Sequence, residues 1–310
     1  MVSKRVVVTG GTGMVGLSLP PRADYEIIRL GSHDCDLRDS AKTAETIQHL
    51  SPRYVIHLAA RVGGLRSNME SKGQYFYDNV LINTNVLEAC RLSRVEKVVS
   101  LLSTCVYPDS ATYPLSEETI HEGFPHFSNY PYAYAKRMLD IQSRAYREQY
   151  GCNFITAVPN NIYGLYDNFS LTDSHVIPAI VHKVWEAKLG KRELTLWGNG
   201  SALREFTFAD DVGRILWFLL ENYNEHDPIN IGNTCEMSIK EVASIICRYL
   251  HYSGKILWDE EKPEGQYRKP SSNKKLISLG WDEYSYTPFE LGIRLTCEWF
   301  TQQYPNVRGI

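Results

Sequence analysis

The chain has 310 residues, of which 43% are hydrophobic and 22% are charged, ordinary values for a globular protein that can bury one or two cores. Its formal net charge of −3 argues against binding to nucleic acid or to an anionic membrane surface. No apolar run approaches the roughly 20 residues that span a bilayer, and seven scattered cysteines without any C-x-x-C pair argue against a disulfide framework or a zinc site.

The first predicted element is a strand, RVVVTG at residues 5–10. It begins so early that we expect no signal peptide and a cytoplasmic protein. The sequence then continues as TGGTGMVG, which places Gly10, Gly13 and Gly16 directly after the strand. Glycine permits a tight turn, a close approach of the backbone to a pyrophosphate, and close packing of a helix on the strand. The helix start that follows offers free N–H groups to phosphates, so the turn predicts a dinucleotide site.

The second predicted strand, YEIIRL at residues 25–30, indicates which dinucleotide is bound. An NAD enzyme normally has an acidic residue just after this strand, where it binds the ribose 2′-hydroxyl. Ser32 and His33 stand there instead, and both could donate hydrogen bonds to a 2′-phosphate. The pattern therefore favours NADP(H), although Asp34 and Asp36 follow closely enough to leave NAD open.

Strands and helices alternate through the first half of the chain. Further apolar runs predict strands at 54–60, 97–103, 154–159 and 228–232, and helical spacing predicts helices at 79–92 and 134–150. Strands that are apolar over most of their length predict a parallel sheet covered on both faces. We therefore expect an α/β fold with a Rossmann-type doubly wound sheet.

The regular alternation stops near residue 160, and the charged run DEEKPEGQYRKPSSNKK at residues 259–275 follows later. We interpret the chain as two domains. The expected dinucleotide-binding domain comprises residues 1–160 with about 203–232, and the smaller substrate domain comprises about 161–202 and 233–310.

A candidate catalytic set stands at Ser103, Tyr132 and Lys136. Tyr132 and Lys136 are four residues apart in PYAYAKRM, which places them on one face of a helix. A nearby ammonium is expected to lower the pKa of the phenol, so that the tyrosine can donate a proton to a carbonyl oxygen as hydride arrives. Ser103, at the end of the strand 97–103, would hold the same oxygen.

The segments TGGTGMVG, HLAARVGG, STCVYP, YAYAK, NNIYGLYDNF, SHVIPA and WGNGSALREF resemble the extended short-chain dehydrogenase/reductases. The resemblance covers essentially the whole chain. STCVYP and SHVIPA are similar to the branch that epimerises and reduces GDP-4-keto-6-deoxy-D-mannose to give GDP-L-fucose. The resemblance implies that substrate, NADP(H) as cofactor, and a homodimer.

The resemblance also gives Cys105 a role. Epimerisation at sugar C3 and C5 requires a base and an acid, and the family uses a cysteine and a histidine that match Cys105 and His175. On an extended chain, Cys105 would point to the same side as Ser103. The thiol would need a lowered pKa to act as base, which a cationic neighbour could provide.

The remaining site residues are implied by the resemblance. The expected cofactor contacts, besides Tyr132, Lys136 and His175, are Gly10, Gly11, Thr12, Gly13, Met14, Val15, Gly16, Ser32, His33, Asp36, Leu37, Ala59, Ala60, Leu101, Leu102, Thr104, Asn160, Asn161 and Ile162. The expected GDP-sugar contacts are Lys183, Trp197, Arg204, Glu264 and Lys269. Cations among these suit a diphosphate.

The chain departs from the family pattern in two places. Pro20 and Pro21 predict a first helix of only about one and a half turns, because proline breaks a helix interior. Thr12 stands where some members carry an arginine for the 2′-phosphate, which weakens the NADP preference.

Two alternative functions stay open. The first is another nucleotide-sugar enzyme of the superfamily, above all one like GDP-mannose 3,5-epimerase, against which His175 and the missing acidic residue argue. The second is a non-catalytic NADP-binding member, against which the intact Ser103, Tyr132 and Lys136 argue.

Overall fold

The computed structural model describes residues 4–262 and 266–310. Its centre is a six-stranded sheet with the order β2-β1-β3-β4-β5-β9, and every pair in it is parallel. The strands are β1 (Lys4–Thr9), β2 (Tyr25–Leu30), β3 (Tyr54–His57), β4 (Lys97–Leu101), β5 (Phe154–Pro159) and β9 (Ile229–Ile231). The chain leaves β1 toward β2 on one side and returns to β3 on the other, so the switch in strand order lies between β1 and β3. The predicted Rossmann-type α/β fold is confirmed.

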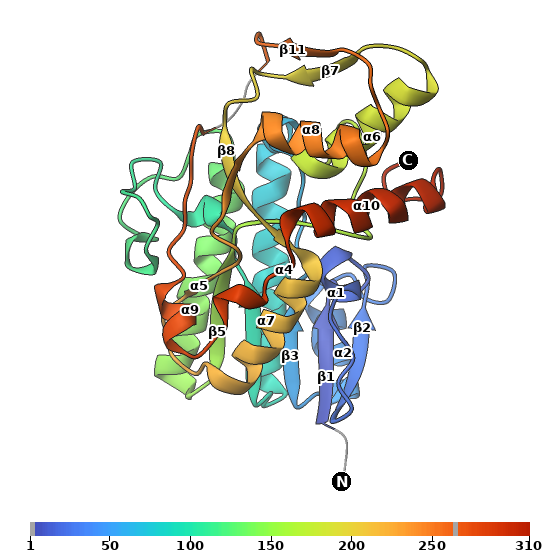
Figure 1. The fold of residues 1–310 in the computed structure, drawn as a ribbon. Coiled ribbons are helices and arrows are strands. Elements are labelled where there is room, and N and C mark those ends of the chain that lie inside the picture. Colours follow the sequence, from blue (N-terminus) through green and yellow to red (C-terminus); the bar gives the residue numbers. More distant parts are fainter. Residues whose placement is uncertain (1–3, 263–265) are drawn as a thin grey trace.

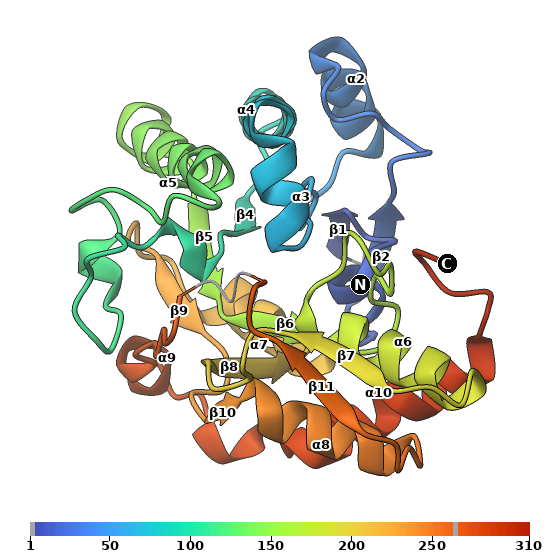
Figure 2. The same cartoon turned by 90° about the horizontal axis from the view of Figure 1, so that it is seen from above.

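Helices cover both faces of this sheet (Figures 1 and 2). One face packs against α2 (Ser40–Leu50), α4 (Lys72–Leu92) and α5 (Tyr130–Tyr150), and the other packs against α7 (Ala209–Asn222). Val7 contributes to the first core, while Val6 and Val8 contribute to the second. All three are fully buried, which stabilises the fold by about 1.5–3 kcal/mol for each side chain.

The first helix is short, as the prolines predict: α1 runs only from Met14 to Leu17. Arg29 of β2 completes its end, because the guanidinium donates to the carbonyl oxygens of Gly16 (2.9 Å) and Leu19 (3.1 Å). The side chain thereby satisfies backbone acceptors that a longer helix would have bonded internally.

The second group of elements forms a smaller body above the carboxyl edge of the sheet in Figure 1. It contains the sheets β10-β8-β6 and β11-β7 with three long helices around a separate core. The elements are β6 (Asn161–Tyr163), α6 (Val176–Leu189), β7 (Leu194–Trp197), β8 (Leu203–Phe208), β10 (Glu236–Ser238), α8 (Ile239–Tyr249), β11 (Ile256–Asp259) and α10 (Phe289–Gln303). Two short helices lie outside this body: α3 (Leu65–Glu70) contacts α4, and α9 (Lys274–Ser278) contacts β9 of the main sheet. Within the described residues, none of the helices is long and apolar enough to cross a membrane.

Candidate active site

The cofactor residues expected from the sequence follow the carboxyl ends of the parallel strands. The turn at Gly10–Gly16 follows β1, the loop at Ser32–Leu37 follows β2, and Ala59 and Ala60 lie just beyond β3. Leu101 ends β4, and Asn160 follows β5 directly. These ends meet along one edge of the sheet, at the switch between β1 and β3, where dinucleotides bind in such folds.

The glycine turn is shaped for close contacts. Gly10 has φ +68°, and a Cβ there would lie 2.7 Å from the backbone nitrogen of Ala59. A Cβ on Gly16 would lie 2.5 Å from the Cα of Gly11. A Cβ on Gly13 would approach only the carbonyl oxygen of Gly10, at 3.2 Å. Packing therefore requires glycine at positions 10 and 16, whereas Gly13 leaves room for a phosphate to approach the backbone.

The two carboxylates after β2 are already engaged. Asp34 accepts a hydrogen bond from the backbone N–H of Gly31 at 2.7 Å. Asp36 accepts from the guanidinium of Arg38 at 2.9 and 2.8 Å, and these bonds lower its pKa to about 2. Both carboxylates thus already serve contacts within the loop, to Gly31 and to Arg38. The loop favours NADP over NAD, as Ser32 and His33 predict.

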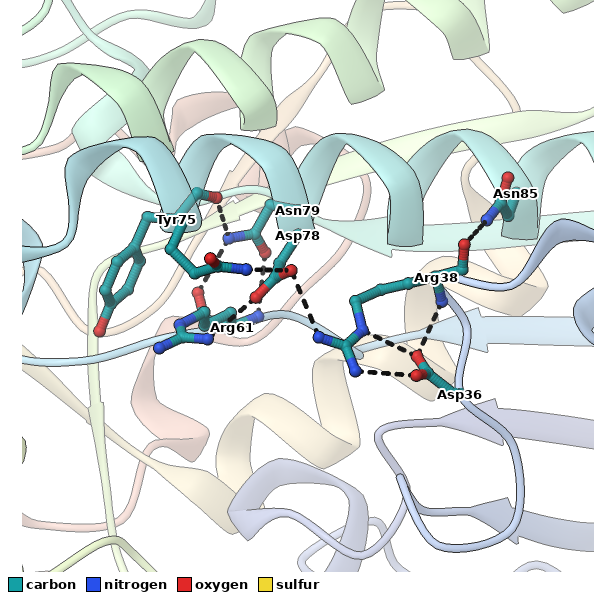
Figure 3. Close-up of polar contacts among 8 residues, drawn as sticks. Asp36, Arg38, Arg61, Tyr75, Asp78, Asn79 and Asn85 are labelled. Atoms are coloured by element: carbon teal, nitrogen blue, oxygen red, sulfur yellow. Dashed lines mark hydrogen bonds and ion pairs between the residues drawn. The ribbon is translucent and has the colours of Figure 1, made fainter.

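Helix α4 ties together the loops after β2 and β3, as Figure 3 shows. The buried carboxylate of Asp78 accepts from Arg61 at 2.9 Å and from Arg38 at 3.4 Å. Asn79 accepts from the backbone N–H of Arg61 at 3.0 Å and donates to its carbonyl oxygen at 3.0 Å. Asn85 donates to the carbonyl oxygen of Arg38 at 3.0 Å. This network was not predicted from the sequence. The signal that could have revealed it is the group of polar residues on the buried face of α4.

Lys136 lies directly beside the end of β4. Its ammonium donates to the carbonyl oxygen of Leu101 at 2.7 Å and lies 5.9 Å from the centre of the Tyr132 ring. Burial lowers the pKa of Lys136 to about 8. Helix α5 thus brings the predicted lysine and tyrosine to the strand that precedes Ser103.

The protonation of Tyr132 differs from the expectation. Burial raises the pKa of Tyr132 well above its ordinary value, and Cys105 and Tyr75 act in the same direction. The expected lowering by Lys136 is therefore wrong for this structure, because desolvation of the phenolate is the largest effect on the pKa of Tyr132. Tyr132 remains a neutral hydroxyl at neutral pH, which is the form that can donate a proton.

The segment after β4 is a turn and not the expected extended chain. Residues Thr104–Val106 form one turn of 3₁₀ helix, and Ser103 caps it by accepting the N–H of Cys105 at 3.4 Å. Serine favours such a cap because its oxygen can bond to the backbone two residues on. Ser103 and Cys105 are neighbours through this hydrogen bond and not through a shared face of a strand.

Cys105 is buried, with 6% of its surface exposed. Burial raises the pKa of its thiol, whereas a hydrogen bond from Ser103 and the charges of Lys269, Lys136 and Arg137 act in the opposite direction. The sequence-based expectation that the pKa of Cys105 is lowered is therefore wrong for this structure. Desolvation of the thiolate outweighs the effect of the three cations.

His175 lies on a different element, as the residue that caps the N-terminus of α6. Its imidazole makes no capping hydrogen bond. Although the residue as a whole is exposed, the protein around the imidazole removes it from water and so lowers its pKa, while Asp173 acts to raise it. Asp173 accepts from the hydroxyl of Tyr75 at 3.5 Å, and Tyr75 packs edge-on against Tyr132 at 6.4 Å between ring centres. The segment that carries His175 thus reaches Tyr132 through Tyr75.

The expected substrate residues fall into two groups. Arg204 of β8 donates to the carbonyl oxygen of Tyr267 at 3.1 Å, and its charge acts on Lys269, which in turn interacts electrostatically with Cys105. Lys183 and Trp197 form a separate pair, with the ammonium 5.5 Å from the ring centre. Glu264 lies outside the described residues.

Comparisons with known proteins agree with this geometry. The model of the NAD dependent epimerase/dehydratase family matches residues 6–232. The GDP-L-fucose synthase of Dictyostelium discoideum is 44% identical, over 99% of this chain and 98% of that protein. The probable GDP-L-fucose synthase of Drosophila melanogaster is 37% identical, over 98% of this chain and 99% of that protein.

A solved structure is also closely similar. The crystal structure of a GDP-L-fucose synthetase from Naegleria fowleri bound to NADP superimposes with a TM-score of 0.93 at 39% identity. The match covers 99% of this chain and 96% of that chain. The chain therefore belongs to the NAD dependent epimerase/dehydratase family, within the group of the GDP-L-fucose synthases.

Proposed function

We propose that the protein is a bifunctional 3,5-epimerase and NADPH-dependent 4-reductase that converts GDP-4-keto-6-deoxy-D-mannose to GDP-L-fucose. The observation that carries the proposal is the meeting of Ser103, Cys105, Tyr132 and Lys136 where β4 ends against α5. The hydroxyls of Ser103 and Tyr132 suit a carbonyl oxygen, while the thiol of Cys105 suits the adjacent C–H bonds. The relatives named GDP-L-fucose synthase and the NADP-bound neighbour support the same function.

The epimerase step uses the acidity of protons next to a ketone. The C4 carbonyl acidifies the C–H bonds at C3 and C5, so the Cys105 thiolate takes a proton and the C–H electron pair forms an enolate. The hydroxyls of Ser103 and Tyr132 stabilise the negative oxygen of this enolate. His175 returns a proton to the opposite face of the same carbon, which inverts it.

The reductase step uses the same oxygen. Tyr132 donates its proton to O4, Ser103 holds that oxygen by a hydrogen bond, and the Lys136 ammonium stabilises the phenolate that remains. NADPH, when bound, supplies the hydride to C4. The residues that fit this cofactor are the glycine turn, with its open position at Gly13, and the loop at Ser32–Leu37.

The test is incubation of the protein with GDP-4-keto-6-deoxy-D-mannose and either NADPH or NADH, followed by identification of the product. We expect GDP-L-fucose with NADPH and a slower reaction with NADH. Formation of a C4 alcohol without inversion at C3 and C5 would restrict the protein to reduction. Failure of both cofactors to give any product would contradict the proposed function.

We also propose the division into domains given by the sequence, with residues 1–160 and about 203–232 binding the cofactor and the remainder binding the GDP-sugar. Support comes from β9 and α7, which join the main sheet and its core. β8 lies at the junction, because it starts this returning segment but pairs with β6 and β10 of the smaller body.

We further propose a homodimer through α4 and α5. Both helices expose large apolar side chains, including Phe76 (40%), Tyr77 (60%), Met138 (44%) and Ile141 (52%). Burying such a patch against a second copy would remove it from water.

Light scattering of the wild type should give twice the chain mass of 35.5 kDa. Ile141→Glu should give the monomer, whereas Leu189→Glu on α6 should remain dimeric. A monomeric wild type would contradict the proposal.

A further inference from the structure

Glu205 of β8 is an unusually buried carboxylate, with 2% of its surface exposed. One oxygen accepts the backbone N–H of Ser271 at 2.9 Å, and the other accepts the Ser271 hydroxyl at 2.5 Å and the side-chain amide of Asn160 at 3.3 Å. All three donors are uncharged groups. Burial of a carboxylate is costly, and these hydrogen bonds offset only part of that cost. Burial accordingly raises the pKa of Glu205, and the hydrogen bonds from Ser271 and Asn160 oppose that rise.

On one side, Glu205 holds residues 266–273, which we call the strap. The strap runs beside β8, where the carbonyl oxygen of Tyr267 accepts the N–H of Leu203 at 2.8 Å and the guanidinium of Arg204 at 3.1 Å. Four residues later, Ser271 is fixed by Glu205. The strap is therefore anchored on β8 at both Tyr267 and Ser271.

Lys269 lies between these two anchors. The other edge of the strap is held by Leu115, whose N–H donates to Pro270 at 2.8 Å and whose carbonyl oxygen accepts from Ser272 at 3.0 Å. With the backbone fixed on both edges, the position of the Lys269 backbone is set by the strap. The charge of Lys269 acts on Cys105, so the strap carries a cation to the candidate catalytic thiol.

On its other side, Glu205 reaches the dinucleotide-binding sheet. Asn160 follows β5 directly and donates to the carbonyl oxygen of Asn233 at 2.8 Å as well as to Glu205. The hydroxyl of Thr207, on β8, donates to the amide oxygen of Asn160 at 2.6 Å. One buried carboxylate therefore connects the strap, β8 and the end of β5.

We propose that Glu205 is a positioning residue that holds the strap so that Lys269 and Arg204 face the diphosphate of the GDP-sugar beside Cys105. This role rests on the proposed function and deepens it. Glu205 does not touch the substrate in this scheme. Because the two cations are held in place before the substrate arrives, less side-chain entropy is lost on binding.

Glu205→Gln tests the proposal with little change of shape. The amide oxygen of glutamine can still accept the Ser271 N–H, but its NH₂ group then faces the donors of Asn160 and Ser271. We expect the KM for GDP-4-keto-6-deoxy-D-mannose and the Kd for GDP, measured by calorimetry, to rise about tenfold. We expect kcat to change by less than about threefold. The KM for NADPH should rise less than the KM for the GDP-sugar, because Asn160, the expected cofactor contact beside Glu205, keeps its hydrogen bonds to Asn233 and Thr207.

Two further variants make the result specific. Ser271→Ala should raise the same KM, and the double variant should be no worse than Glu205→Gln alone, because both remove one interaction. Glu236→Gln is the matched control. Glu236 lies on β10, directly opposite Glu205 of β8, and its carboxylate accepts a hydrogen bond from Arg268 of the strap at 2.8 Å. Loss of this more exposed pair should change the KM by less than about twofold.

Normal KM and Kd values in Glu205→Gln would overturn the inference, and so would a lower melting temperature with both values unchanged. If the wild-type protein fails to turn over the GDP-sugar, the proposed function fails. The comparison of GDP affinities would then still decide whether Glu205 positions the strap.

Discussion

Replacing Tyr132 by phenylalanine is expected to slow reduction of the C4 ketone by about 10²- to 10⁴-fold, the usual contribution of a positioned proton donor. Tyr132 is suited to this role because burial raises its pKa and so keeps the hydroxyl protonated. The reduction rate of the wild type should therefore stay level through neutral pH and fall above the Lys136 pKa of about 8, where the ammonium that stabilises the phenolate is lost while Tyr132 is still protonated. Nicotinamide absorbance in a single turnover measures the step.

Tyr134→Phe is the matched control. Tyr134 lies two residues further along α5, where Arg137 lies over its ring at 5.4 Å, and we expect its loss to change the rate by less than about twofold. Exchange of the C3 and C5 protons should suffer less than reduction in Tyr132→Phe, because Ser103 still holds the enolate oxygen. A Tyr132→Phe protein that reduces the ketone at the wild-type rate would show that another group donates the proton.

Much of the main sheet could be predicted from sequence. Its inner strands are buried on both faces, so their apolar runs are continuous, and the run at 154–159 coincides with β5. The run at 25–30 coincides with β2, although this edge strand is only partly buried. The prolines at 20 and 21 likewise predicted the short α1. The three-residue strands β6 and β10 were not predicted, because such short segments carry no periodic pattern. α4 begins at Lys72 and not at the predicted residue 79. The first turns of the helix were missed because the apolar residues between 72 and 78 do not follow a helical spacing.

The sequence could predict which residues belong to the candidate site, but not the direction of their pKa shifts. The spacing of Tyr132 and Lys136 correctly indicated that they share a helix, yet the direction of the pKa shift depends on burial, which spacing does not reveal. Asp78 and Glu205 escaped prediction for a related reason. A carboxylate in sequence suggests an exposed side chain, and only the fold shows that its partners come from distant segments.

Replacing Cys105 by serine is expected to slow exchange of the C3 and C5 protons with deuterated water by about 10²- to 10⁴-fold, because an alcohol is a far weaker acid than a thiol and supplies almost no conjugate base. Mass spectrometry of the recovered GDP-sugar measures the exchange. Cys152→Ser is the control, since burial also raises the pKa of Cys152 but that residue lies beyond the C-terminal end of α5, after Gly151. Its exchange rate and melting temperature should match the wild type.

The pH dependence of proton exchange tests whether Cys105 and His175 act together as base and acid. Burial raises the pKa of Cys105 and lowers that of His175, so the resting pair is a neutral thiol and a neutral imidazole. The reactive pair, thiolate with imidazolium, is then a minor form whose population is constant between the two pKa values. Exchange should fall below the His175 pKa as the thiolate is lost, and above the Cys105 pKa as the imidazolium is lost. The expected profile is a broad plateau whose lower limit lies below the ordinary histidine value near 6.5 and whose upper limit lies above the ordinary cysteine value near 8.5.

Undiminished exchange in Cys105→Ser would show that another group is the base. A narrow maximum in the pH profile would show that substrate binding reverses the effect of burial on the pKa values of Cys105 and His175.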